Sequence, residues 1–71
     1  MCSLKEVKIN TDIIKLDSFL KWSGAVSQGS EAKIYILNGE VKVNGETETR
    51  RSKKLSIGDI IEFQGEQYKI I

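Results

Sequence analysis

The sequence predicts a small α+β domain, with two packed N-terminal helices against a small, mostly antiparallel sheet. Three observations lead to this fold class: apolar residues at helical spacing near the N-terminus, a second segment without helix breakers, and a C-terminal half that alternates apolar and polar residues between glycine-containing turns. Helices followed by hairpin strands are typical of α+β domains. At 71 residues there is room for one small core, so we expect a single domain over residues 1–71.

The first expected elements are a short edge strand over residues 4–9 and a helix that begins near Leu16. The apolar face of this helix repeats at i, i+3, i+4 and i+7: Leu16, Phe19, Leu20 and Ser23. Gly24 is expected to end the helix. Trp22 falls beside the apolar face, and we expect it at the rim of the core, with an exposed stacking platform as the alternative.

A second helix is expected to start within residues 27–30 and to continue through Leu37, because no breaker interrupts it. Ala32 is small enough to let the two helices approach closely. Lys33, one position along, is expected to face solvent. Asn38-Gly39 is typical of a left-handed helix C-cap, so the helix should end there.

The remaining chain is expected to form hairpin strands. Val41 and Val43 alternate with polar residues up to Asn44-Gly45, the strongest short-range signal for a tight hairpin turn. Thr47 and Thr49 are expected to continue the return strand. Further turns at residues 58–59 and 64–65 separate the last predicted strands, which lie at residues 60–63 and 68–71.

Positive charge concentrates at one place although the chain carries a net charge of only +1. Four cations lie within five residues: Arg50, Arg51, Lys53 and Lys54. A solvated loop is the ordinary interpretation of such a run. However, neighbouring cations repel one another and contribute little to a small fold, whereas RNA phosphates stabilise each of them and release counterions. We therefore expect this segment to contact RNA.

Six other residues are candidate RNA contacts. Three are lysines that can serve either contact or solubility, and three are neutral donors at the expected start of the second helix. They are Lys15, Lys21 and Lys33, and Ser27, Gly29 and Ser30. An ordinary N-cap explains the neutral group equally well. Their placement decides between these alternatives, because contact requires one surface shared with residues 50–54.

Enzyme, metal and membrane functions find no support in the sequence. The chain has no histidine, no phosphate-binding Gly-Lys-Ser or Gly-Lys-Thr motif, and one cysteine, Cys2, in an expected fraying terminus. Asp59 follows a glycine between apolar segments, which is typical of a turn. No apolar run approaches the roughly 20 residues that span a bilayer. We expect a cytoplasmic protein without catalysis, metal or cofactor.

Residues 15–46 resemble the RNA-binding domain named after small-subunit ribosomal protein four, also called the αL motif, with a core motif over about residues 15–63. The matching motifs are Leu16-Asp17, Ser30-Glu31-Ala32, Gly39, Val41-Lys42-Val43-Asn44-Gly45 and, later, Gly58-Asp59. The small size and residues 50–59 are most similar to the stand-alone bacterial YaaA-like subgroup. Gly29 departs from the arginine usual in the family, which leaves backbone N–H groups at this helix start as the phosphate donors.

The resemblance implies binding of structured RNA, such as ribosomal RNA, by shape and charge, with a role in ribosome assembly or quality control. We expect the protein to be a monomer. It implies no catalysis. The alternative is a protein-interaction adaptor that uses a sheet edge or the surface of Trp22 and Tyr35, with its basic loop on an acidic partner. DNA binding is disfavoured, because the second helix carries too few base-reading side chains on one face.

Overall fold

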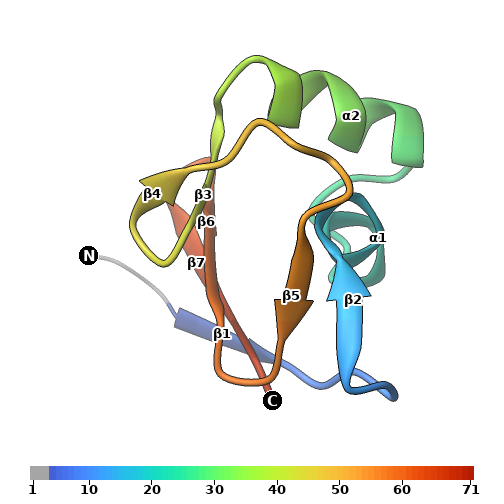
Figure 1. Cartoon of the computed structure of the whole chain (residues 1–71), viewed down its shortest axis with the longest axis vertical. Helices are drawn as coiled ribbons and strands as arrows, with labels where there is room; N and C mark the ends of the chain where they lie inside the picture. The colour runs from blue at the N-terminus through green and yellow to red at the C-terminus, as the bar shows by residue number, and fades with distance from the viewer. Residues whose placement is uncertain (1–3) are drawn as a thin grey trace.

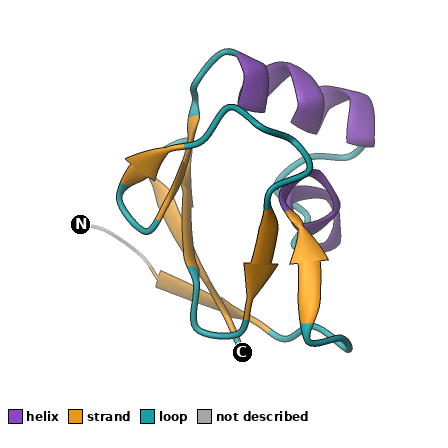
Figure 2. Cartoon of the chain, in the orientation of Figure 1, coloured by secondary structure: helices purple, strands orange, loops and turns teal. Residues whose placement is uncertain are grey.

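A computed structural model describes residues 4–71, which contain two helices and seven strands (Figures 1 and 2). The elements are, in chain order, β1 (Leu4–Val7), β2 (Ile13–Lys15), α1 (Leu16–Trp22), α2 (Gly29–Leu37), β3 (Val41–Val43), β4 (Glu46–Thr47), β5 (Lys54–Ser56), β6 (Ile60–Phe63) and β7 (Glu66–Ile70). Cys2 lies outside the described residues. No helix within residues 4–71 has the length and apolar character to cross a bilayer.

The main sheet has five strands in the order β1-β7-β6-β3-β4. Its pairs are antiparallel except β1 with β7, which run parallel, and β1 is an edge strand as expected. Lys5 on β1 donates to Glu66 on β7 over 3.1 Å and forms an ion pair between the two strands. The expected small, mostly antiparallel sheet is confirmed.

A second, two-stranded sheet pairs β2 with β5 in antiparallel register and was not expected. Residues 13–15 and 54–56 are too short to show a period-two pattern, and they lie about forty residues apart in the chain, so no local signal announces the pairing. Figure 1 shows this ribbon apart from the main sheet, with β2 leading directly into α1. This pairing places Lys54 and the basic residues that precede it next to the start of α1.

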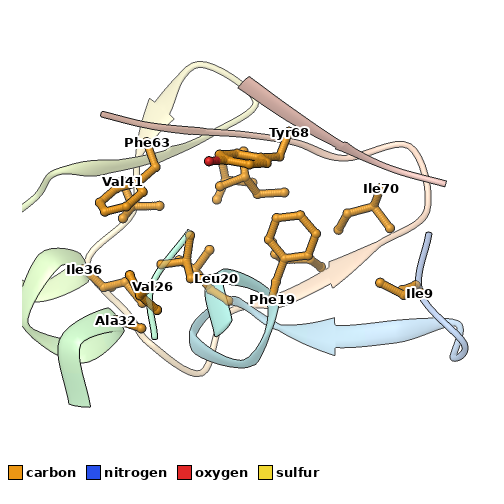
Figure 3. Close-up of a cluster of buried hydrophobic side chains, with 14 residues drawn as sticks. Ile9, Phe19, Leu20, Val26, Ala32, Ile36, Val41, Phe63, Tyr68 and Ile70 are labelled. Carbon is orange, nitrogen blue, oxygen red and sulfur yellow. The ribbon is translucent and has the colours of Figure 1, made fainter. Parts of the chain in front are cut away.

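The core lies between the two helices and the inner face of the main sheet (Figure 3). Phe19 of α1 meets Tyr68 of β7 edge-on, with ring centroids 6.3 Å apart. Ala32 is fully buried where α2 packs against α1, as expected from its size. Tyr35 on α2 contacts Phe63 with centroids 5.0 Å apart, so this ring is engaged within the fold.

The turns follow the sequence closely. Asn44 and Gly45 have φ of 52° and 86°, the two successive positive values that a tight type I′ hairpin turn requires. Gly39 has a φ of 75° and provides the expected left-handed end of α2. One expectation is wrong: β4 ends at Thr47, so Thr49 is not in a strand. The Glu48 carboxylate accepts the N–H groups of Thr49 and Arg50, and the chain leaves the sheet at this point.

Candidate nucleic-acid interface

Residues 50–54, called here the basic segment, are fixed to the start of α1 by backbone hydrogen bonds. The N–H of Leu16 donates to the Lys53 carbonyl over 2.9 Å, and the N–H of Asp17 donates to the Arg51 carbonyl over 3.2 Å. The first N–H groups of a helix have no partner within the helix, so the segment satisfies donors that would otherwise need water. The basic segment is therefore held in place rather than free in solvent.

Lys15 and Lys54 lie directly opposite each other on β2 and β5. Both residues are exposed, and no carboxylate within residues 4–71 is at ion-pairing distance from either. Side chains at directly opposite positions start ~5 Å apart at Cβ, and like charges placed so destabilise the pairing. This cross-strand pair creates a point of uncompensated positive charge that an anion would relieve.

A surface depression of about 270 Å³ lies within the basic segment. Its lining consists of Arg50, Ser52, Lys53 and Lys54. These side chains supply cationic donors and one hydroxyl but no carboxylate. The depression suits a phosphate group, which accepts several charge-assisted hydrogen bonds at once.

Arg50 differs from the other cations because it has an acidic partner. Its Nε lies 3.2 Å from Oε2 of Glu48, and the same carboxylate oxygen accepts the backbone N–H of Arg50. Hydrogen bonding from Arg50 is the main reason that the pKa of Glu48 lies below its ordinary value of 4.5. Part of the charge of Arg50 is thus balanced within the protein. Arg51, Lys53 and Lys54 have no ion-pair partner in the described part of the chain.

A larger polar groove of about 450 Å³ separates the β3–β4 hairpin from β5. It is lined by Val43, Asn44, Glu46, Thr47, Glu48, Lys53, Lys54, Ser56 and Asp59. The lysines come from the β5 side, whereas Glu46 and Glu48 come from the hairpin side. A phosphate in this groove would meet carboxylates, so the hairpin side suits an anion less well than the basic segment does.

The hairpin that bounds this groove is fixed by hydrogen bonds of two side chains, a role that the local sequence does not indicate. Oδ1 of Asn44 accepts the N–H of Ile60 over 3.0 Å, and its Nδ2 donates to Asp59. The other oxygen of Asp59 accepts the N–H of Ser56 over 2.9 Å. Asn44 and Asp59 thus fasten the tip of the hairpin to β5 and β6. The expected turn role of Asp59 agrees with this arrangement.

The other candidate residues lie farther along the helices. Lys21 is exposed near the end of α1, and Lys33 is exposed on α2 as expected. Ser27, Gly29 and Ser30 are exposed at the start of α2, where no side chain caps the helix. Ser27 Oγ instead donates to Glu31 over 2.8 Å. No hydrogen bond or ion pair within residues 4–71 joins these five residues to the basic segment, so their contact with RNA remains a prediction.

Trp22 is 53% exposed, which favours the stacking-platform alternative over the rim of the core. Its Nε1 donates to the Lys8 carbonyl over 2.9 Å. Helical geometry places Trp22 at the edge of the apolar face, three residues from Phe19 and two from Leu20, so the spacing alone did not decide between the two alternatives. Lys8, which adjoins the indole, was not among the expected site residues.

The sequence profile of the S4 domain matches residues 7–71. This chain belongs to the S4 domain family. The match includes the whole motif region over residues 15–63, so the resemblance found in the sequence is confirmed.

Two relatives of this S4 domain protein are curated bacterial proteins. It is 39% identical over 59 residues to the "Probable ribosome maturation protein RlbA" of Bacillus subtilis (strain 168), a match that covers 83% of each chain. It is 36% identical over 58 residues to YbcJ of Escherichia coli (strain K12), covering 82% of this chain and 83% of YbcJ. Both matches span most of each partner.

Solved structures show the same S4 fold. The solution structure of E. coli YbcJ, described as revealing an αL motif involved in RNA-binding, has a TM-score of 0.66 and 30% identity and covers 97% of this chain and 86% of YbcJ. The crystal structure of 30S ribosomal protein S4e from Thermoplasma acidophilum has a TM-score of 0.64 and 28% identity. It covers 84% of this chain but 32% of S4e, so the likeness to S4e concerns one part of that protein.

Proposed function

We propose that this S4 domain protein binds structured RNA through the basic segment and Lys15, that ribosomal RNA is its target, and that it acts in ribosome maturation. The observation that carries the proposal is the placement of Lys15 opposite Lys54, beside a depression lined by cations without a carboxylate. A phosphate on this surface removes the repulsion between the lysines and releases counterions, so its binding is favourable at low salt.

The fixed backbone of the basic segment favours recognition of the shape of an RNA. Hydrogen bonds from Leu16 and Asp17 fix the basic segment, and Asn44 fixes the neighbouring hairpin. Positive charges at fixed positions match the phosphates of a folded RNA better than those of a flexible strand, because little side-chain and loop ordering is needed on binding. Recognition of shape and backbone is the usual way in which proteins bind paired RNA.

The relatives support the ribosomal part of the proposal. RlbA is named for ribosome maturation, YbcJ has a motif involved in RNA-binding, and S4e is a protein of the 30S ribosomal subunit. We infer a role of the same kind here, carried out in the cytoplasm by a monomer without catalysis or cofactor. Lys21, Lys33 and the start of α2 extend the proposed RNA surface along the helices.

The decisive test is a binding titration of purified bacterial ribosomal RNA, followed by the change in sedimentation or anisotropy of the labelled RNA. A double variant, Lys15→Gln with Lys54→Gln, removes two charges from the proposed surface. The matched control, Lys42→Gln with Lys69→Gln, removes two charges from the outer face of the main sheet. We expect the first pair to weaken binding at least roughly tenfold at 50 mM salt, and the control to have a much smaller effect. Equal losses would contradict the proposed surface.

The ribosomal target has a separate test. The protein is purified from lysate with and without nuclease, and the recovered material is analysed for ribosomal RNA and particles. Recovery of ribosomal particles that is lost after nuclease treatment supports the proposal. Recovery of a protein partner that survives nuclease supports the alternative, an adaptor whose basic segment lies on an acidic protein.

A further inference from the structure

Trp22 has an exposed ring that is held in one orientation. More than half of its surface is exposed at the end of α1, although large aromatic residues are mostly buried in globular proteins. Its one polar atom, Nε1, already donates to the Lys8 carbonyl over 2.9 Å. What remains exposed is therefore the apolar ring. It is held by a hydrogen bond to a backbone carbonyl, so no other side chain is needed to hold it.

The neighbours of Trp22 on α1 are polar or positively charged. Ser18 is a helical neighbour of both Lys21 at i+3 and Trp22 at i+4, and all three residues are exposed. Lys8, whose carbonyl holds the indole, is exposed as well. Within residues 4–71, neither a second aromatic ring nor a cation stacks on Trp22. Two exposed lysines are close to the indole in the chain or through the backbone: Lys21, which precedes it, and Lys8, whose carbonyl accepts its N–H.

We propose that Trp22 stacks against an unpaired base of the bound RNA, while Lys8 and Lys21 contact phosphates of the same strand. This inference rests on the proposed function and adds a site for a single-stranded base to it. Aromatic side chains beside cations are the usual means of holding unpaired bases, because every base has a face that stacks. An apolar protein partner fits less well, since it would remove water from two lysines without offering them an anion.

The position of Trp22 relative to the basic segment agrees with this proposal. Lys15 precedes the first residue of α1 and Trp22 is its last, so the two lie about 10 Å apart along the helix axis at ~1.5 Å per residue. Phosphates bound at Lys15 and Lys54 and a base stacked at Trp22 can therefore belong to one RNA, with a paired region over the basic segment and an unpaired residue at the end of α1.

The chain offers a direct probe, because Trp22 is its only tryptophan. Two fluorescein-labelled RNAs serve as ligands at 50 mM salt: a hairpin with a loop of eight adenosines, and a blunt duplex of the same number of nucleotides. Binding is measured by anisotropy, and stacking is measured by quenching of the intrinsic fluorescence of the wild-type protein. We expect strong quenching by the hairpin and little by the duplex.

Variants provide the second arm. Trp22→Ala should weaken hairpin binding roughly tenfold while changing duplex binding less than about twofold, and Trp22→Phe should retain most of the affinity because it keeps a ring. The matched control is Ile34→Ala, which removes an apolar side chain of similar exposure from α2. Unfolding curves of each variant show whether it is folded under the assay conditions.

The outcomes are distinguishable. Hairpin binding without quenching, and with equal affinities for wild type and Trp22→Ala, overturns the stacking site but leaves the proposed function intact. Absence of an anisotropy change with either RNA overturns both proposals. The wild-type quenching measurement requires no substitution, so the stacking site is tested even if Trp22→Ala does not fold.

Discussion

Asn44 donates a hydrogen bond from Nδ2 to Oδ1 of Asp59 over 3.3 Å and so joins two turns that are fifteen residues apart. The same carboxamide accepts the backbone N–H of Ile60, and the backbone N–H of Asn44 donates to the Ile60 carbonyl over 2.7 Å. Asn44 has a positive φ, which asparagine tolerates better than most residues. One residue therefore both shapes the hairpin turn and attaches it to β6, the neighbour of β3 in the main sheet.

The Asn44 side chain can be tested against a second turn of the same kind. Gln64 also has a positive φ, of 51°, but its side chain makes no hydrogen bond in the described part of the chain. Replacement by glycine removes the backbone strain at both positions. We expect Asn44→Gly to be less stable than Gln64→Gly by about 1 kcal/mol, because only the former loses side-chain hydrogen bonds. Urea unfolding measures this difference, and equal free energies would show that the Asn44 bonds contribute nothing.

The lysine pair predicts opposite effects on stability and binding. Lys54→Gln removes the repulsion with Lys15, so at low salt we expect the free energy of unfolding to rise by about 0.2–1 kcal/mol while RNA binding weakens. The gain in stability should shrink in 500 mM salt, because screening already reduces the repulsion. Urea unfolding and RNA titration of the same preparation check the expected rise in the free energy of unfolding and the expected loss of RNA affinity. A variant that is less stable at low salt would argue against repulsion.

The Glu48–Arg50 contact predicts a pH dependence of stability. Because the folded-state pKa of Glu48 is lowered, its contribution is present above its ordinary pKa of 4.5 and is lost as the pH falls through the folded-state value. Glu48→Gln should therefore reduce the loss of stability on acidification below about pH 5. Some loss should remain, since hydrogen bonds from Tyr68 and Lys5 also lower the pKa of Glu66.

Unfolding by urea at a series of pH values measures this effect. Glu46→Gln is the matched control, an exposed carboxylate of the same hairpin whose side chain makes no ion pair within residues 4–71. The prediction is wrong if both variants show the same pH profile.

The cations of the basic segment should not contribute equally to RNA affinity. Each lost phosphate contact lowers the slope of log affinity against log salt by about 0.7–0.9. Arg51→Gln should show a loss of this size. Arg50→Gln should show a smaller one, because Arg50 must first give up part of its contact with Glu48. Titrations between 50 and 200 mM salt give the slopes, and a larger loss for Arg50 would reverse the expected order.

Local signals in the sequence predicted the helices and the turns. Positive φ at Gly39 and at Asn44-Gly45 depends on residues adjacent in the chain, and these positions are evident from the sequence alone. The apolar spacing of α1 likewise placed Phe19 and Leu20 in the core correctly. Trp22 shows the limit of a rule based on residue type: it lies at the edge of the apolar face, its Nε1 donates to the Lys8 carbonyl, and more than half of its surface is exposed.

Long-range pairing could not be predicted in the same way. β2 and β5 have three residues each, and their register of Ile13 with Ser56 depends on how the intervening helices and hairpin pack. The sequence therefore indicated which cations belong to the candidate site. It did not indicate that Lys15 and Lys54 lie opposite each other on paired strands. The hydrogen bonds of Glu48, which accompany the turn of the chain after Thr47, could not be predicted from the sequence either.

The position of β7 between β1 and β6 has a consequence for the order of events during synthesis. β1 is the first of the described strands to be made, yet its hydrogen-bonding partner, Glu66–Ile70, is the last of them. While the chain grows on the ribosome, β1 must wait without a partner until those residues have emerged. The main sheet can therefore close at this edge only after Glu66–Ile70 has left the exit tunnel.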